Sequence, residues 1–117
     1  MKRMKQAVAL GLALGLLAPA AVLANTGDPV AAKAKISMCM GCHSIPGYKT
    51  AFPVTYNVPK IGGQNAAYIV KALQAYRSGD RKHPSMRAVA ASLTDQDMAD
   101  LAAYYSNTAP AAPAAKK

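Results

Sequence analysis

The residues whose types and spacing could do chemistry lie in one pentapeptide, Cys39-Met40-Gly41-Cys42-His43, which holds both cysteines of the chain. On one turn of a helix, side chains three residues apart project from the same face. Two thiols so placed can each add to a vinyl group of one haem, and His43 then reaches the iron from the same side. Cys-x-x-Cys-His is the spacing of covalent haem attachment. The sequence therefore predicts one haem c, bound through Cys39 and Cys42 and ligated by His43.

Two other interpretations of the cysteine pair find less support in the sequence. A thioredoxin-type dithiol needs a preceding strand and a βαβ pattern, and neither is visible. A structural zinc site needs four ligands, and even with His83 one ligand is missing. Haem attachment is the interpretation that uses every residue of the motif.

An electron-carrying haem iron needs a second axial ligand, and a thioether sulfur favours the ferrous state and raises the reduction potential. Most of the six methionines are unsuited to this role: Met1 and Met4 belong to the leader, Met38 and Met40 flank the attachment site, and Met98 falls in a helical apolar stripe. Met86 lies far downstream, after a loop and outside an obvious stripe, so it is the predicted distal ligand. His83, three residues earlier, is the alternative and would give a bis-histidine haem.

The N-terminal segment has the features of a secretory leader. A basic start, residues 1–6, precedes an uncharged run, residues 7–23, and small residues then predict cleavage before Asn25. The alternative is a membrane anchor, but Pro19 interrupts a run that is of marginal length and rich in Ala and Gly. We therefore expect residues 1–24 to be a cleaved signal peptide and the mature protein to lie in the periplasm.

The rest of the chain divides into a domain, residues 25–107, and an Ala/Pro/Lys tail, residues 108–117. The tail is too low in complexity to bury a core, so we expect it to be disordered. The folded part is then roughly 80 residues, a size at which apolar burial alone gives marginal stability. The chain has one Phe, no Trp and many alanines, so we expect an apolar cofactor to complete the core.

The formal net charge of +9 falls to +6 without the leader, because the leader holds three of the 14 Lys and Arg and none of the five Asp. Two more lysines lie in the tail. There is no Arg-rich run and no pattern of base-stacking aromatic residues. This mild basic excess does not indicate a nucleic-acid-binding protein.

Capping signals predict where helices begin and end. Asp28-Pro29 begins a helix that runs into the attachment motif. Asn65 begins a second helix, which Gly79 ends, and Thr94 begins a third. Residues 44–58, with their prolines and glycine, are predicted to form a loop, and no segment indicates a strand. The predicted fold class is all-α, with three to four helices wrapped around one covalently bound haem.

The chain resembles the class I cytochrome c family, and specifically its short bacterial members, including either half of the two-haem kind. The resemblance extends from about residue 27 to 106 and adds four stretches, in family order, to the attachment motif. These are Pro59-Lys60-Ile61-Gly62-Gly63-Gln64, Tyr76-Arg77-Ser78-Gly79-Asp80-Arg81, Met86-x-x-Val89-x-x-x-Leu93 and the segment from Asp97 to Tyr105. The ordered set indicates the class I cytochrome c fold, which the pentapeptide alone would not.

The resemblance implies roles for further residues around the haem. Pro59 would offer its carbonyl oxygen to the second ring N–H of His43, which fixes the imidazole as a ligand. Gly62 and Gly63 would let the backbone pass close to the haem. Arg77 would lie near a haem propionate, and an exposed arginine at a helix end is the alternative.

The resemblance also implies how the last helix crosses the first. Tyr104 or Tyr105 would pack at this crossing. A glycine is usual there in the first helix, and this chain has Ala31-Ala32 instead. We therefore expect slightly looser packing between the two helices.

The function that the resemblance implies is one-electron transfer rather than catalysis, because a His/Met haem has no open position on its iron. The alternatives are a redox subunit of a membrane or periplasmic oxidoreductase complex, and a haem enzyme or gas sensor with a labile distal ligand. Redox proteins with an acidic docking face are the expected partners. They would meet cations of loops and helix ends, namely Lys49, Lys60, Arg81, Lys82 and Arg87.

Overall fold

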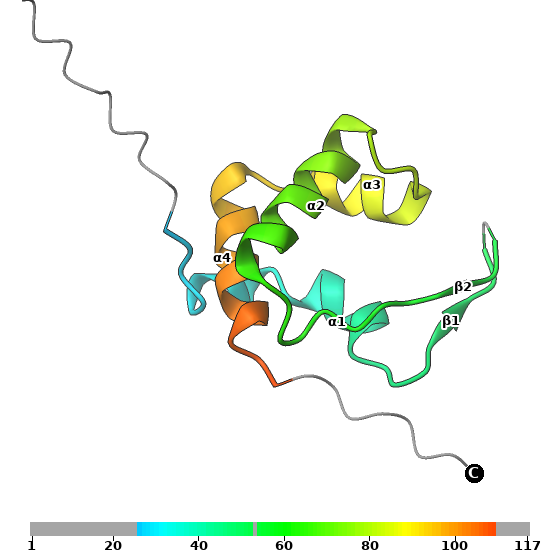
Figure 1. Cartoon of the computed structure of the whole chain (residues 1–117), viewed down its shortest axis with the longest axis horizontal. Helices are drawn as coiled ribbons and strands as arrows, with labels where there is room; N and C mark the ends of the chain where they lie inside the picture. Colours follow the sequence, from blue (N-terminus) through cyan, green and yellow to red (C-terminus); the bar gives the residue numbers. More distant parts are fainter. Residues whose placement is uncertain (1–25, 53, 110–117) are drawn as a thin grey trace, which may run out of the picture.

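Helices dominate the part of the chain that the computed structural model describes, residues 26–52 and 54–109 (Figure 1). The elements are a 3-10 helix (Ala31–Ala34), α1 (Ser37–His43), β1 (Lys49–Thr50), β2 (Tyr56–Asn57), α2 (Ala66–Ser78), α3 (Pro84–Ala91) and α4 (Asp95–Ser106). The predicted all-α class is confirmed, with one small hairpin added. The predicted signal peptide, residues 1–24, and most of the predicted tail, residues 108–117, lie outside the described residues.

Local signals set both ends of α2. The Asn65 side chain accepts a hydrogen bond from the Tyr68 N–H at 3.0 Å, which caps the start of the helix as predicted. At the other end, Gly79 adopts a φ of +93°, and its N–H donates to the Ala75 carbonyl at 3.1 Å. This left-handed conformation strains residues that carry a Cβ, so glycine is the residue suited to end the helix here.

A reciprocal cap begins α4, as the Thr94 signal predicted. Thr94 Oγ1 accepts a hydrogen bond from the Asp97 N–H at 3.1 Å, and the Asp97 carboxylate accepts one from the Thr94 N–H at 2.9 Å. The hydrogen bonds from Thr94, and then the ion pair with Lys35 at 3.2 Å, hold the pKa of Asp97 below its ordinary value. Because Lys35 precedes α1, the ion pair also ties α4 to the segment that leads into the attachment motif.

The first helix differs from the prediction. The chain does not form one continuous helix from Pro29; it forms a 3-10 turn first, and the α-helix begins at Ser37. Contacts with α4 account for the break. The Asp28 N–H donates to Asp100 Oδ1 at 2.7 Å, and Ala32 is fully buried. These tertiary contacts shape the segment more strongly than helix propensity does.

A two-stranded hairpin and one helix go beyond the sequence prediction. β1 and β2 pair antiparallel inside the stretch that was predicted to be a loop. Each strand has two residues, too few for an alternating pattern to be visible. α3 occupies the stretch around Met86, where the sequence indicated a loop before that residue. Its eight residues are too few for a clear period, but Pro84 in its first turn is a start signal.

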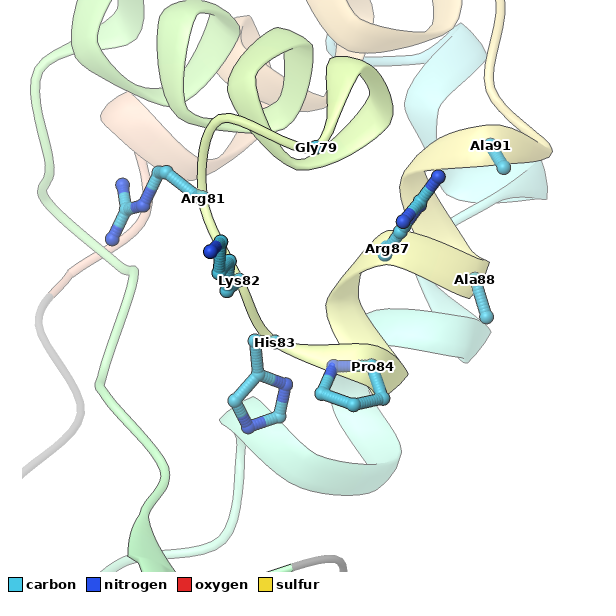
Figure 2. Close-up of a pocket in the computed structure, with 8 residues that line it drawn as sticks. All are labelled: Gly79, Arg81, Lys82, His83, Pro84, Arg87, Ala88 and Ala91. Atoms are coloured by element: carbon cyan, nitrogen blue, oxygen red, sulfur yellow. The ribbon is translucent and has the colours of Figure 1, made fainter.

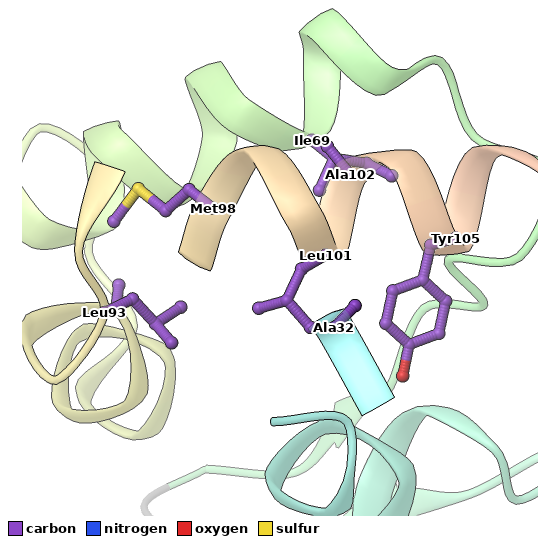
Figure 3. Close-up of a cluster of buried hydrophobic side chains, with 8 residues drawn as sticks. Ala32, Ile69, Leu93, Met98, Leu101, Ala102 and Tyr105 are labelled. Atoms are coloured by element: carbon purple, nitrogen blue, oxygen red, sulfur yellow. The ribbon is translucent and has the colours of Figure 1, made fainter. Parts of the chain in front are cut away.

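α4 lies at the centre of the hydrophobic core (Figure 3). Its buried side chains Met98, Leu101, Ala102 and Tyr105 pack with Ala32 of the 3-10 helix, Ile69 of α2 and Leu93 of the α3–α4 loop. Met98 is fully buried, which confirms the core role predicted for it. Four of the nine buried apolar residues in the described ranges are alanines, so the core is poor in large side chains.

The close approach between the N-terminal segment and α4 occurs at Gly27. A Cβ atom on Gly27 would lie 1.9 Å from the Ala99 carbonyl oxygen and 3.0 Å from the Ala103 Cβ. The small residue expected at the crossing is therefore present, but earlier in the chain than Ala31-Ala32. The looser packing predicted from those two alanines is not found, because Ala32 is fully buried.

Gly27→Ala should lower the free energy of unfolding of the haem-loaded protein by about 2 kcal/mol, because an inserted methyl group would collide with backbone and overpacking costs roughly 1–3 kcal/mol. Gly41→Ala is the matched control. A Cβ on Gly41 meets no atom within 4 Å, and alanine is favoured over glycine in a helix such as α1. Denaturant unfolding measures both variants. Equal stabilities for the two would contradict the close approach at Gly27.

Candidate functional site

The predicted site residues meet around a narrow apolar cavity between the helices. Cys39 and His43 from α1 line it together with Met86 from α3. The other lining residues, all apolar or aromatic, are Met38, Ile61, Ile69, Leu73, Val89, Leu93, Leu101 and Tyr105. One thiol, one imidazole and the thioethers of Met38 and Met86 thus share the same apolar surroundings.

His43 is held in a defined orientation at this cavity. Its Nδ1 lies 2.6 Å from the carbonyl oxygen of Pro59, the contact that the sequence resemblance implied. A carbonyl oxygen can only accept a hydrogen bond, so Nδ1 carries the proton. Nε2 then keeps its lone pair, and the tautomer is the one that binds a metal through Nε2. Pro59 thereby acts as the group that orients this imidazole.

The two cysteines differ in exposure. Cys39 is half-buried at the cavity wall, while Cys42, three residues later on α1, is exposed and does not line the cavity. Neither forms a disulfide. Burial raises the pKa of the Cys39 thiol, so the thiol form predominates at neutral pH. Cys39 therefore lacks the lowered pKa of a redox nucleophile.

Met86 lies in the first turn of α3 and is half-buried at the cavity. Pro84 opens this helix, and His83 caps it by accepting a hydrogen bond from the Met86 N–H at 3.4 Å through Nδ1. The His83 ring packs edge-on against Tyr56, with 5.4 Å between the ring centroids. His83 is not among the residues that line the cavity. Of these two candidates, Met86 lines the cavity together with His43 and His83 does not, and the distal ligand remains a prediction.

Tyr105 adds a polar atom that the sequence interpretation did not assign to the site. Its ring is buried in the core, where the resemblance expected Tyr104 or Tyr105 to pack. Within the described ranges, its hydroxyl is buried and has no hydrogen-bond partner. Burial raises the pKa of this hydroxyl far above its ordinary value, so it stays protonated. A buried hydroxyl without a partner at a cavity wall fits a site that holds a further group.

Comparison with known proteins identifies the family of this chain. The family model described as Cytochrome c matches residues 30–109. The chain belongs to the cytochrome c family. This cytochrome is similar to cytochrome c-554(548) of Halomonas halodenitrificans, with 40% identity over 84 residues that cover 69% of this chain and 96% of that protein.

Longer relatives match this cytochrome as well. Cytochrome c4 of Pseudomonas aeruginosa is 38% identical over 105 residues, which cover 88% of this chain and 48% of that protein. The crystal structure of reduced recombinant cytochrome c4 from Pseudomonas stutzeri matches with a TM-score of 0.52 and 32% identity, over 72% of this chain and 51% of that chain. This cytochrome therefore spans about half the length of these cytochromes c4, and the resemblance to the class I family is confirmed.

Family membership implies a covalently bound haem c with its iron, and the site fits that group. Two thiols stand three residues apart on α1, an oriented imidazole follows, and the cavity walls are apolar. In the described part of the chain, no cluster of three or more His, Cys, Asp or Glu could hold a metal ion by protein ligands alone. The zinc interpretation therefore lacks ligands. The cytochrome is a haem electron-transfer protein.

The remaining predicted residues lie around the cavity rather than at its walls. Gly62 and Gly63 form the turn after Ile61, and the Gly63 N–H donates to the Tyr105 carbonyl at 2.8 Å. Their backbone thus anchors the end of α4, and neither glycine lines the cavity. Closeness to the haem remains an expectation for both.

Arg77 has contacts that differ from the predicted propionate role. Its guanidinium donates to the Leu93 carbonyl at 3.2 Å and pairs with the Asp95 carboxylate at the start of α4. It does not line the cavity. These contacts join the end of α2 to the α3–α4 loop and the start of α4, and the propionate role of Arg77 remains a prediction.

Proposed function

We propose that this cytochrome is a periplasmic one-electron carrier with a single haem whose iron is ligated by His43 and Met86. The observation that carries the proposal is the shared cavity, which the oriented His43 imidazole of α1 and the Met86 thioether of α3 both line, whereas the other lining thioether, Met38, belongs to α1 beside the attachment motif. One Cys-x-x-Cys-His motif and no further cysteine are consistent with one haem.

Four side chains would hold the cofactor, two by covalent bonds and two as ligands of the iron. Cys39 and Cys42 would form the two thioether bonds, and Nε2 of His43 and the sulfur of Met86 would be the axial ligands. When bound, the haem supplies an iron that alternates between the ferrous and ferric states and so holds or releases one electron. The Pro59 carbonyl makes the imidazole a better donor, while the soft thioether of Met86 favours the ferrous state.

Two filled axial positions also argue against an enzyme or gas sensor. Such proteins need an open or labile position on the iron. The wild-type protein should therefore show a six-coordinate low-spin spectrum and react with carbon monoxide slowly or not at all in its reduced state. Rapid carbon monoxide binding, followed by its absorption change, would favour the enzyme or sensor alternative instead.

Periplasmic location rests on the leader in the sequence. Residues 1–24 carry the basic start, the apolar run and the small residues of a cleavable signal peptide. In the described residues, no helix is long and apolar enough to cross a membrane. Fractionation of cells that express the full chain should recover the red protein in the periplasmic fraction. Its first residue should be Asn25, because the signal peptide has been removed.

The charge of the protein favours a redox partner with an acidic docking face. Lys49 begins β1, six residues after His43, and Lys60 directly follows Pro59, the residue that orients His43. Both lysines are exposed, so they are placed to guide an acidic partner to this side of the haem.

Electron transfer with such a partner should slow at least about tenfold between low and high ionic strength, because screening acts over about 8 Å at physiological salt. Lys49→Gln with Lys60→Gln should lower the bimolecular rate at low salt and leave the haem spectrum unchanged. Lys33→Gln with Lys71→Gln removes the same charge elsewhere and serves as the control. A bimolecular rate that stays constant or rises with salt would exclude the acidic-partner proposal. The proposal that the protein transfers electrons would still stand.

A further inference from the structure

A second concave site lies on the outer side of α3, apart from the apolar cavity (Figure 2). It is a groove between the α2–α3 loop and α3, lined by Gly79, Arg81, Lys82, His83, Pro84, Arg87, Ala88 and Ala91. It shares no lining residue with the cavity of His43 and Met86. We refer to these eight residues as the basic groove.

The basic groove concentrates uncompensated positive charge. Three of its lining residues, Arg81, Lys82 and Arg87, are cationic, and none is acidic. The two ion pairs found in the described ranges, Lys35 with Asp97 and Arg77 with Asp95, lie elsewhere. Like charges that face one concavity repel each other, and an anion placed between Lys82 and Arg87 relieves that repulsion.

Contacts hold one of the two arginines of the groove, Arg81, in place, and the other, Arg87, lies beside Gly79. The Arg81 guanidinium lies 4.6 Å from the centroid of the Tyr76 ring and donates to the Tyr68 hydroxyl at 3.3 Å. The Arg87 guanidinium rests near Gly79, where a Cβ would be 3.8 Å from its Cζ and NH1 atoms. Figure 2 shows Arg87 on α3, across the groove from the α2–α3 loop, whereas the Arg81 side chain leaves that loop in the direction away from α3.

The start of α3 adds to the same potential. Pro84, the first residue of this eight-residue helix, lines the groove. The N-terminal end of a helix carries a partial positive charge, which falls off within the first turn. The helix end and the side-chain cations Lys82 and Arg87 therefore act on the same volume. Convergence of these sources is what distinguishes the groove from scattered surface lysines.

We propose that the basic groove binds a small multivalent oxyanion of the phosphate or carboxylate class. The planar fork of Arg87 can hold two anionic oxygens at once, and Lys82 supplies a point charge from the opposite wall. The ligand reaches the groove either free in solution or as neighbouring carboxylates on an acidic protein. The site is independent of the proposed axial ligands, so it can be tested without reference to electron transfer.

The test is calorimetric titration of the haem-loaded protein with inorganic pyrophosphate at low ionic strength. Lys82→Gln with Arg87→Gln should weaken binding at least about tenfold, the equivalent of about 1.4 kcal/mol. Lys33→Gln with Lys71→Gln removes the same charge outside the groove and should weaken binding less than about threefold. Arg87→Lys keeps the positive charge but removes the planar guanidinium that can hold two oxygens at once. This variant should show a loss of pyrophosphate affinity between those of the groove and control variants.

Two results would overturn the proposal. The first is no pyrophosphate binding by the wild-type protein at low ionic strength. The second is an equal loss of pyrophosphate affinity in the groove and control variants, which would show that the anion responds to the net charge of the protein alone. A hexaglutamate peptide, titrated against the same variants, identifies the source of the anion. Binding of both probes through the groove indicates a partner's carboxylates, and binding of pyrophosphate alone indicates a free small anion.

Discussion

Replacement of both cysteines, Cys39→Ser with Cys42→Ser, should reduce the yield of folded red protein by more than about tenfold, because a domain this small has only marginal stability without its cofactor. The structure shows why the polypeptide alone is insufficient. Among the described residues, Met98 and Leu101 are the largest fully buried side chains, and four of the nine buried apolar residues are alanines. Leu73 and Val89 are half-buried and line the cavity, where an apolar cofactor would cover their side chains.

Extraction with acidified organic solvent measures the covalent bond directly. The wild-type protein should keep its red pigment in the protein fraction, because thioether bonds survive this treatment and axial ligation does not. Met40→Ala is the matched control, since Met40 lies between the two cysteines and is 45% exposed. That variant should retain the haem. Free haem in the solvent phase of the wild type, or red protein from the double variant, would refute covalent attachment.

Features set by short-range interactions could be predicted from the sequence. Asn65 and Thr94 cap their helices through hydrogen bonds that reach three residues ahead, and Gly79 ends α2 through its own φ angle. The attachment motif is equally local, because α1 alone places Cys39 three residues before Cys42. The sequence neighbours of such residues contain most of the information that determines their structure.

Features set by distant contacts could not be predicted in the same way. The approach of Gly27 to the Ala99 carbonyl depends on how α4 docks, and no local pattern marks it. The unpaired Tyr105 hydroxyl and the contacts of Arg77 with Leu93 also depend on tertiary packing. Family resemblance supplied one long-range contact, between His43 and Pro59, and it misplaced another, at Ala31-Ala32.

Met86→Ala should abolish the weak sulfur-to-iron absorption at the red edge of the ferric spectrum and should admit external ligands such as cyanide or imidazole. Met38→Ala is the matched control. Met38 lines the same cavity but belongs to α1, five residues before His43, so this variant should keep the absorption. His83→Ala removes the cap of α3 and should cost about 1 kcal/mol of stability without removing the band. Loss of the band in the His83 variant, with its retention in the Met86 variant, would transfer the ligand role to His83.

Met86→His gives the sharpest electronic test of the distal ligand. An imidazole stabilises the ferric iron better than a thioether does, so the reduction potential should fall by on the order of 0.1 V, a modest part of the roughly 0.8 V range set by axial ligands. Potentiometric titration of the variant measures this shift, and the low-spin spectrum should persist because the iron stays six-coordinate. If the potential and the spectrum both stay at their wild-type values, Met86 does not contact the iron, and its place at the cavity wall is one of packing alone.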